Sequence, residues 1–319
     1  MYNLNISILD AGTLGDDIDF SMFDVFGNVN IYEKTKPEEV GDRISGSDVV
    51  IVNKIKLNGA NLGNAKKLRL ICVTATGFDN IDTAYCKENK IAVCNVKGYS
   101  TDSVAQITMA MALSLINSLP QYDSYVKDLS YTKSGVQNCV TPVFREMSRL
   151  TWGVVGLGGI GRRVAELAKA FGCRILAYKR SADSEFNCVS LEELCTQSDI
   201  ISIHLPLSEQ THQIISKSLI EMMKKTAVVI NAARGAVVDE AALAKAIKED
   251  KLGGLGVDVY STEPMTYNSP YTEITDRKNV ILTPHMAWAA YESRVRCMEE
   301  IVNNIRFFMD GEIRNRVDI

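Results

Sequence analysis

The sequence predicts an α/β protein with two doubly wound domains, each built on a parallel sheet, and a cleft between them. Two observations carry this prediction. Short apolar runs alternate with longer segments of helical period along the whole chain, which is the pattern of strands and crossover helices in parallel sheets. The chain also has 319 residues, more than one hydrophobic core usually serves.

The strands are predicted in two series. The first series indicates a small α/β unit, and its strand candidates are residues 5–9, 29–32, 48–52, 69–73 and 91–93. The second series indicates a full six-stranded sheet with helices between its strands, at residues 151–155, 174–178, 199–204, 226–230, 255–259 and 280–282.

Two long segments of helical period flank the second series. Residues 102–119 are predicted to form the helix that connects the two units, because Val104, Ile107, Met111 and Leu115 recur near helical spacing. Residues 292–309 have the same period and follow the sixth strand. We therefore expect this last helix to cross back and cover the first unit.

The composition excludes several classes of protein. Hydrophobic residues make up 46% and charged residues 23%, as in an average globular protein rather than a disordered chain. No run approaches the roughly 20 apolar residues that span a bilayer, and the N-terminus lacks the pattern of a signal peptide. We therefore predict a cytoplasmic protein that contacts no membrane.

The charge and the metal-ligating residues point to a small-molecule partner. The net charge is -4 without a block of lysine or arginine, so we expect no nucleic-acid binding. The eight cysteines form no C-x-x-C pair and are predicted to be reduced and mostly buried. Three histidines at no metal-ligand spacing predict no metal site.

A glycine-rich turn marks a nucleotide site. The segment Gly156-Leu157-Gly158-Gly159-Ile160-Gly161 directly follows a predicted strand and opens a predicted helix. Such glycines let the backbone and the helix N-terminus approach a pyrophosphate, whereas a turn that is only flexible would need no strand and helix around it. The context therefore predicts binding of a dinucleotide, NADP or NAD.

The residues after the next strand bear on the choice between NADP and NAD. An NAD-binding unit usually has an acid there, which binds the ribose hydroxyls. This chain instead has Lys179, Arg180 and Ser181, which suit a 2′-phosphate through charge-assisted hydrogen bonds. We therefore predict a preference for NADP, with ordinary surface cations as the alternative explanation.

Three reactive side chains follow three neighbouring strands of the second series. Arg234, Glu263 and His285 each come shortly after a strand, and ligands bind beyond the carboxyl ends of parallel strands. Each residue also has a structural explanation, as a surface ion pair, a turn residue or a core histidine. Together beside a hydride carrier, they predict reduction of a 2-oxo acid.

The chemistry assigns a role to each of the three. Arg234 would hold the substrate carboxylate and carbonyl with its planar fork of donors. His285 would give a proton to the carbonyl oxygen as hydride reaches the carbon. Glu263 would fix the imidazole tautomer and favour its protonated form. His204 is a weaker candidate, which either lines the cofactor site or packs in the core.

These segments resemble the D-isomer-specific 2-hydroxyacid dehydrogenase family over nearly the whole chain. The matching motifs are residues 76–82, 156–161, 231–235, 256–259, 263–264 and 283–285. The resemblance implies a flavodoxin-like substrate domain, residues 1–101 with 287–319, and a Rossmann NAD(P)-binding domain, residues 102–286. It also implies a homodimer joined through the nucleotide domain.

The resemblance assigns further residues to the site. It makes Arg234, Glu263 and His285 catalytic, and it places the substrate carboxylate at the backbone of Ala75, Thr76 and Gly77. Asp258 would hold the nicotinamide amide. The remaining cofactor contacts would come from Gly156, Gly158, Gly159, Ile160, Gly161, Leu205, Pro206, Thr211, Ala232, Ala233 and Arg234.

Within the family, residues 52–54, 98–106 and 284–288 are similar to the glycerate dehydrogenase, or hydroxypyruvate reductase, branch. Lys54, Tyr99 and Trp288 would then shape a small polar pocket for hydroxypyruvate or glyoxylate, unless they are only packing or rim residues. Three alternatives remain open at this point. They are a dehydrogenase for D-lactate or a branched 2-hydroxy acid, a formate dehydrogenase relative, and a nucleotide-sensing corepressor-like protein without turnover.

Overall fold

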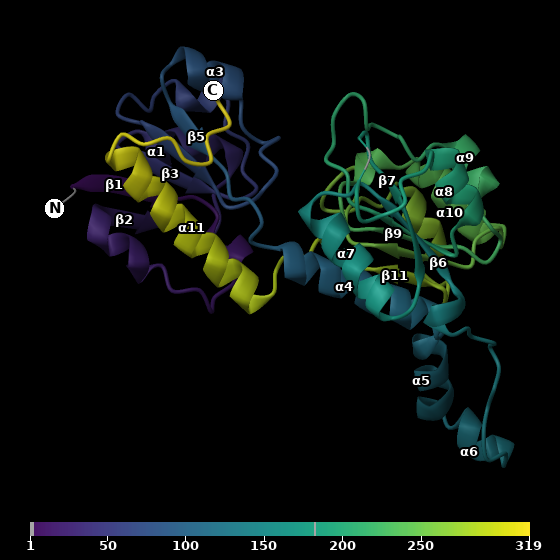
Figure 1. Cartoon of the computed structure of the whole chain (residues 1–319). Helices are drawn as coiled ribbons and strands as arrows, with labels where there is room; N and C mark the ends of the chain where they lie inside the picture. Colours follow the sequence, from purple (N-terminus) through teal and green to yellow (C-terminus); the bar gives the residue numbers. More distant parts are fainter. Residues whose placement is uncertain (1–2, 182) are drawn as a thin grey trace. The chain divides into compact units, whose positions relative to one another are not determined.

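The structure is a computed structural model that describes residues 3–181 and 183–319 (Figure 1). The chain divides into two compact units. Unit 1 comprises Met1–Ser100 and Ala289–Ile319, and unit 2 comprises Thr101–Trp288. Unit 1 is therefore formed from both ends of the chain, whereas unit 2 is continuous. Each unit contains one parallel sheet, so the predicted α/β class with two parallel-sheet units is confirmed.

Unit 1 is built on a five-stranded parallel sheet in the order β2-β1-β3-β4-β5. Strands β3 and β4 are buried along their whole length, which explains why each reads as an uninterrupted apolar run. The helix α11 (Tyr291–Met309) packs against β4, as expected for a helix that crosses back from the end of the chain (Figure 1). The other elements are β1 (Leu4–Ile8), β2 (Gly27–Ile31), β3 (Val49–Val52), β4 (Leu70–Val73), β5 (Ala92–Cys94), α1 (Val40–Ile44), α2 (Gly59–Leu62), α3 (Thr83–Glu88) and the 3-10 turns Ala11–Leu14, Ser21–Phe26 and Pro37–Glu39.

Unit 2 is built on a six-stranded parallel sheet in the order β11-β10-β9-β8-β6-β7. Because all the strands are parallel, the loops that follow them leave the sheet at one edge. Helix α4 (Thr101–Ile116) packs on α7, β9 and β10, and its Met111 contacts the position where Gly256 has no side chain. The strands are β6 (Thr151–Val155), β7 (Arg174–Tyr178), β8 (Ile200–Ile203), β9 (Val228–Asn231), β10 (Gly254–Val257) and β11 (Val280–Leu282).

The remaining elements of unit 2 are short. They are α7 (Gly159–Ala170), α8 (Leu191–Gln197), α9 (Lys217–Met222), α10 (Glu240–Lys248) and the 3-10 turns Met147–Arg149, Gly235–Val237 and Pro270–Ile274. No single helix within the described ranges is long and apolar enough to cross a membrane. Among the described residues, one bent pair of helices, α4 with α5 (Leu119–Lys127), reaches the required length and composition.

A helical arm extends from the end of α4. It comprises α5 (Leu119–Lys127), α6 (Ser130–Ser134) and the chain that returns to the sheet, and Figure 1 shows it projecting away from the other elements of unit 2. Neither α5 nor α6 contains a buried residue. The sequence analysis did not predict these two short helices, which bury no residue against a core.

Each of the predicted strands is found among the described residues. Three have the predicted bounds, at residues 151–155, 174–178 and 280–282, and the ends of the others shift by at most two positions. Two of the shifts have a common cause. Asp48 and Asp199 were predicted to begin strands, but each stands just before its strand, where its carboxylate also accepts a hydrogen bond from the neighbouring strand. Oδ2 of Asp48 accepts a hydrogen bond from the Asn5 N–H at 2.9 Å, and Oδ2 of Asp199 accepts one from the Thr151 N–H at 2.9 Å. At each position the carboxylate adds to a backbone hydrogen bond, because the N–H of Asp48 donates to the Asn5 carbonyl and the N–H of Asp199 donates to the Thr151 carbonyl, both at 2.8 Å.

The eight cysteines are free thiols, and six of them are buried, as predicted. Burial raises the pKa of Cys195 to about 12, which keeps this thiol protonated and unreactive at neutral pH. The thiols therefore serve as small core residues.

Candidate active site

The glycine-rich turn has the geometry of a pyrophosphate cradle. Gly156 follows β6 with a positive φ of 98°, which favours glycine. At Gly161 a Cβ atom would lie 1.9 Å from the Gly156 carbonyl oxygen, so only glycine permits this close packing of helix α7 on the turn. At Gly158 a Cβ would meet no described atom within 4 Å, so packing alone does not require glycine there. The bare backbone and the N-terminus of α7 together fit a bound pyrophosphate.

The loop after β8 lies against this turn. A Cβ atom on Gly156 would come within 2.8 Å of the Leu205 side chain. The Thr211 hydroxyl donates to the Pro206 carbonyl at 2.6 Å and accepts from the Ser208 N–H at 2.8 Å, which folds the loop back on itself. The predicted cofactor residues from the ends of β6 and β8 therefore share one edge of the sheet.

The predicted cations follow β7 at the same edge, but they are not isolated charges. Lys179 Nζ lies 3.4 Å from Oδ2 of Asp183, and Arg162 Nη2 lies 2.5 Å from the same oxygen. A backbone hydrogen bond from Glu185 and the Arg162 guanidinium lower the pKa of Asp183 to about 2. Sequence reasoning found no acid at the end of the strand and missed this carboxylate, because it comes four residues after Lys179 on a loop.

Glu263 and His285 form a direct pair. The Glu263 Oε2 atom lies 2.6 Å from Nδ1 of His285, and Glu263 Oε1 accepts a hydrogen bond from the Tyr260 N–H at 3.0 Å. The carboxylate is thus held by its own loop while it orients the imidazole, and Nδ1 carries the shared proton when Glu263 is ionised. The side chains of His285 and Glu263 remain 23% and 32% exposed, so a small molecule can reach the pair.

The backbone of His285 is held in an unusual conformation. Its φ is 54°, in the left-handed region that a non-glycine residue rarely adopts. The His285 N–H donates to the Thr283 carbonyl at 3.1 Å, and the Trp288 indole donates to the His285 carbonyl at 2.9 Å. Surrounding contacts therefore fix this residue in a strained state, which is common at functional sites.

Asp258 anchors the loop that carries His285. Its side chain is buried at the end of β10. Oδ1 accepts from the Thr283 hydroxyl at 2.6 Å and from the Met286 N–H at 2.9 Å, and Oδ2 accepts from the Ala287 N–H at 2.9 Å. This anchoring role was not predicted from the sequence, and the predicted contact with the nicotinamide amide stays a prediction.

Arg234 lies on the loop after β9, the strand next to β10. Its Nη1 donates to the Ala233 carbonyl at 2.8 Å, and its own carbonyl accepts from Asn231 Nδ2 at 3.0 Å. At Gly235 a Cβ atom would lie 2.0 Å from the Tyr260 carbonyl carbon. This glycine lets the Arg234 loop touch the loop that leads to Glu263, so the three predicted residues come from adjoining loops at one edge of the sheet.

The two buried or half-buried histidines of this edge differ in chemistry. Burial lowers the pKa of His204 to about 3, and neither of its ring nitrogens has a hydrogen-bond partner among the described residues. His204 is therefore a neutral imidazole at any working pH and is unsuited to donate a proton. His285, with its carboxylate partner and its exposed edge, is the candidate for proton transfer.

The predicted substrate residues of unit 1 follow β3 and β4 at the carboxyl edge of its sheet. The N–H of Lys54 donates to Oδ2 of the buried Asp10 at 2.6 Å, and burial raises the pKa of Asp10. The Thr76 hydroxyl donates to the Val96 carbonyl at 2.8 Å, which shapes the turn that includes Ala75 and Gly77. Tyr99 is buried, with its carbonyl accepting from Arg296 Nη2 at 3.0 Å.

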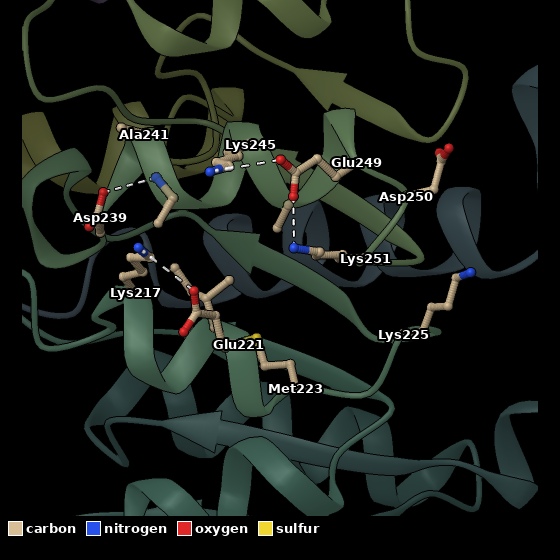
Figure 2. Close-up of a pocket in the computed structure, with 13 residues that line it drawn as sticks. Lys217, Glu221, Met223, Lys225, Asp239, Ala241, Lys245, Glu249, Asp250 and Lys251 are labelled. Carbon is tan, nitrogen blue, oxygen red and sulfur yellow. Dashed lines mark hydrogen bonds and ion pairs between the residues drawn. The ribbon is translucent and has the colours of Figure 1, made fainter.

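A separate cavity of about 600 Å³ lies beside α9 and α10 (Figure 2). Several of its charged side chains pair with one another, as Figure 2 shows for Lys217 with Glu221 and for Lys251 with Glu249. The two N–O distances are 3.8 Å and 2.7 Å. None of the predicted site residues lines it. Within the described ranges, no group of three or more His, Cys, Asp or Glu residues is placed to hold a metal.

The fold and the site define a class of protein. A six-stranded parallel sheet carries the glycine-rich turn of residues 156–161, here called the glycine cradle, at a helix N-terminus. The same edge of the sheet holds an arginine and a carboxylate–imidazole pair. A dinucleotide bound there would supply a hydride. These features define a dehydrogenase that depends on a nicotinamide dinucleotide.

Comparison with known proteins identifies the family. Residues 109–287 match the NAD binding domain of the D-isomer specific 2-hydroxyacid dehydrogenases. The chain is 34% identical to the glycerate dehydrogenase of Methylorubrum extorquens, covering 90% of this chain and 91% of that protein. It is 33% identical to the hydroxypyruvate reductase of Blautia hydrogenotrophica, covering 99% and 100% of the two chains.

Solved structures agree with this assignment. The D-lactate dehydrogenase of Aquifex aeolicus, complexed with NAD and lactic acid, is 32% identical with a TM-score of 0.86 over 99% of both chains. An acyclic imino acid reductase in complex with NADPH and D-Arg has 28% identity and a TM-score of 0.87, covering 98% of this chain and 100% of that chain. The chain belongs to the D-isomer specific 2-hydroxyacid dehydrogenase family and is an oxidoreductase of that family.

Proposed function

We propose that this enzyme reversibly reduces a small 2-oxo acid, hydroxypyruvate or glyoxylate, to D-glycerate or glycolate, with NADPH preferred over NADH. The observation that carries the proposal is the pair of Glu263 and His285, 2.6 Å apart at the edge of the sheet that bears the glycine cradle. Similarity to relatives named glycerate dehydrogenase and hydroxypyruvate reductase supports the choice of substrate.

The side chains divide the chemistry among them. Arg234 binds the substrate carboxylate and the carbonyl oxygen, which orients the 2-carbon and polarises its C=O bond. A nicotinamide dinucleotide held at the glycine-rich turn of residues 156–161 would supply the hydride to that carbon. His285 releases a proton to the carbonyl oxygen, so the 2-oxo acid gains one hydride and one proton and becomes the 2-hydroxy acid. Glu263 holds the imidazole ring in place through Nδ1, so that Nε2 can face the carbonyl oxygen.

Unit 1 is proposed to provide the substrate domain. The backbone of Ala75, Thr76 and Gly77 would bind the substrate carboxylate, and Lys54 and Tyr99 would set the size of the side-chain pocket. Trp288, which donates to the His285 carbonyl at 2.9 Å, would add an aromatic wall beside the reacting imidazole. A small, polar pocket of this kind favours hydroxypyruvate and glyoxylate over branched 2-oxo acids.

A substrate panel tests the proposed activity. With NADPH present, we expect the absorbance of the reduced cofactor to fall when hydroxypyruvate or glyoxylate is added, with kcat/KM at least about tenfold above that for pyruvate or a branched 2-oxo acid. The reverse reaction with D-glycerate and NADP provides the control for reversibility. A higher kcat/KM with pyruvate would favour a D-lactate dehydrogenase, and no turnover with any 2-oxo acid would favour a dinucleotide-sensing protein.

The cofactor preference is proposed to come from Lys179, Arg180 and Ser181 after β7. Arg180 Nη1 lies 3.4 Å from Gln210 Oε1, so this cation also faces the loop that follows β8. Changing Lys179→Asp together with Arg180→Ala is expected to raise KM for NADPH by roughly tenfold or more relative to NADH, because two cations are lost and one anion is gained. Steady-state kinetics with both cofactors measure this. Unchanged Michaelis constants would contradict the assignment.

We also infer that the enzyme is a homodimer joined through the nucleotide-binding unit, by the arm of residues 119–149. The arm exposes large apolar side chains, including Val140 at 74% and Val143 at 84%, and single domains rarely leave such a surface bare. We expect a dimer in light scattering after gel filtration, and a monomer for Val140→Asp with Val143→Asp. Val25→Asp, at an exposed valine of unit 1, is the matched control. A wild-type monomer would refute this inference.

The location of the protein stays a prediction. Eight free thiols, six of them buried, support a reducing compartment such as the cytoplasm.

A further inference from the structure

The carboxylate of Asp183 lies between two cations, Arg162, which follows the glycine cradle, and Lys179, which follows β7. The side chain of Asp183 is only 5% exposed. Its Oδ2 atom contacts two cations, Arg162 Nη2 at 2.5 Å and Lys179 Nζ at 3.4 Å. Its Oδ1 atom accepts hydrogen bonds from the N–H groups of Glu185 at 3.0 Å and Phe186 at 3.4 Å. Asp183 therefore binds two charged side chains through one carboxylate oxygen and the backbone of its own loop through the other.

The position of this cluster relates it to the cofactor. Lys179 is the first residue after β7, where a parallel sheet of this kind meets the adenosine ribose. Arg162 directly follows Gly161, the last glycine of the cradle, on helix α7. The two cations that Asp183 binds thus come from the two segments on either side of the expected 2′-oxygen of the ribose.

We propose that Asp183 sets how strongly the enzyme distinguishes NADPH from NADH, by competing with the 2′-phosphate for Lys179 and Arg162. This inference rests on the proposed use of a nicotinamide dinucleotide. In the absence of cofactor, the carboxylate holds both cations and offsets part of their charge. A bound 2′-phosphate must share the two cations with Asp183. The 2′-hydroxyl of NADH is neutral and does not need an ion pair with either cation. Asp183 therefore weakens the preference for NADPH that the cations create.

The carboxylate acts as a fixed negative charge. The hydrogen bond from Glu185 and the Arg162 guanidinium hold the pKa of Asp183 at about 2, so it stays ionised throughout the working range of pH. Glu185 also pairs with Arg162, at 2.7 Å, but its side chain is 49% exposed and solvent screens it more strongly. The buried acid is therefore the stronger competitor for the two cations.

The test is the variant Asp183→Asn, which removes the charge but keeps an oxygen that can accept from Glu185 and Phe186. We expect the ratio of kcat/KM for NADPH to kcat/KM for NADH to rise roughly five- to tenfold, the effect of one unit charge near a partly exposed phosphate. The rise should shrink as salt is added, because added ions screen the removed charge. Asp250→Asn is the matched control, since Asp250 pairs with Arg277 elsewhere on unit 2.

A binding measurement makes the test independent of turnover. Calorimetry should show that Asp183→Asn binds adenosine 2′,5′-bisphosphate more tightly than the wild type by a similar factor, while AMP binds equally to both. Thermal unfolding confirms that the variant is folded. If no 2-oxo acid were reduced, the proposed function would fail, and this binding comparison would still decide the role of Asp183.

Two results would overturn the inference. An unchanged preference between the two ligands in a folded variant would show that the charge of Asp183 does not reach the 2′-phosphate. A weaker binding of adenosine 2′,5′-bisphosphate would show that Asp183 is needed to order the cations, which is the opposite role.

Discussion

Replacing His285 with alanine is expected to lower kcat for hydroxypyruvate or glyoxylate reduction by roughly a thousandfold while NADPH still binds, because the imidazole serves proton transfer and not dinucleotide recognition. His285 is the histidine of this edge with a carboxylate partner, at 2.6 Å. His204 stays neutral because burial lowers its pKa to about 3, so it cannot take over as the acid.

The variant Glu263→Gln distinguishes the role of Glu263 in positioning His285 from the role of His285 in proton donation. An amide can still contact Nδ1 but carries no negative charge to face the ring, so we expect kcat to fall by roughly ten- to a hundredfold. NADPH fluorescence measures cofactor binding in both variants, and thermal unfolding checks their folding. Turnover by His285→Ala within about tenfold of the wild type at neutral pH would assign the proton to another group.

The second large effect is expected at Arg234. Changing Arg234→Gln removes the charge and the fork that bind the substrate carboxylate, so we expect kcat/KM for the 2-oxo acid to fall by about a thousandfold, the size expected for two charge-assisted hydrogen bonds. Arg234→Lys keeps the charge and loses the planar fork of donors, so its kcat/KM should lie between those of the wild type and Arg234→Gln. Steady-state kinetics at saturating NADPH measure both variants.

The matched control for this prediction is Arg174→Gln. Arg174 is an exposed arginine that begins β7. It therefore lies at the amino ends of the parallel strands, on the side of the sheet away from the candidate site. We expect its kinetics to equal those of the wild type. Retention of substrate affinity in Arg234→Gln would place the carboxylate elsewhere, with the backbone of residues 75–77 as the next candidate.

Much of the fold follows from local patterns in the chain. The buried parallel strands are short apolar runs such as residues 200–203 and 228–231, and each is flanked by a helix with a recognisable stripe. The glycine cradle could also be predicted, because glycines at this spacing between a strand and a helix are a local sequence pattern. The structure shows their cause in the positive φ of Gly156 and in the contact of Gly161 with the Gly156 carbonyl. The arm of residues 119–149 was missed because its helices α5 and α6 bury no residue against a core.

For the candidate site too, the sequence predicted one part and the tertiary structure decided another. Sequence alone determined that Arg234, Glu263 and His285 follow neighbouring strands, because the chain order of parallel strands brings their carboxyl ends to one edge. Only the tertiary structure decided which groups touch. The contact of Glu263 with His285, the anchoring of residues 286–287 by Asp258, and the capture of Lys179 by Asp183 all depend on loop paths that no periodicity encodes. Side chains far apart in sequence pair according to these paths, so their chemistry appears only in three dimensions.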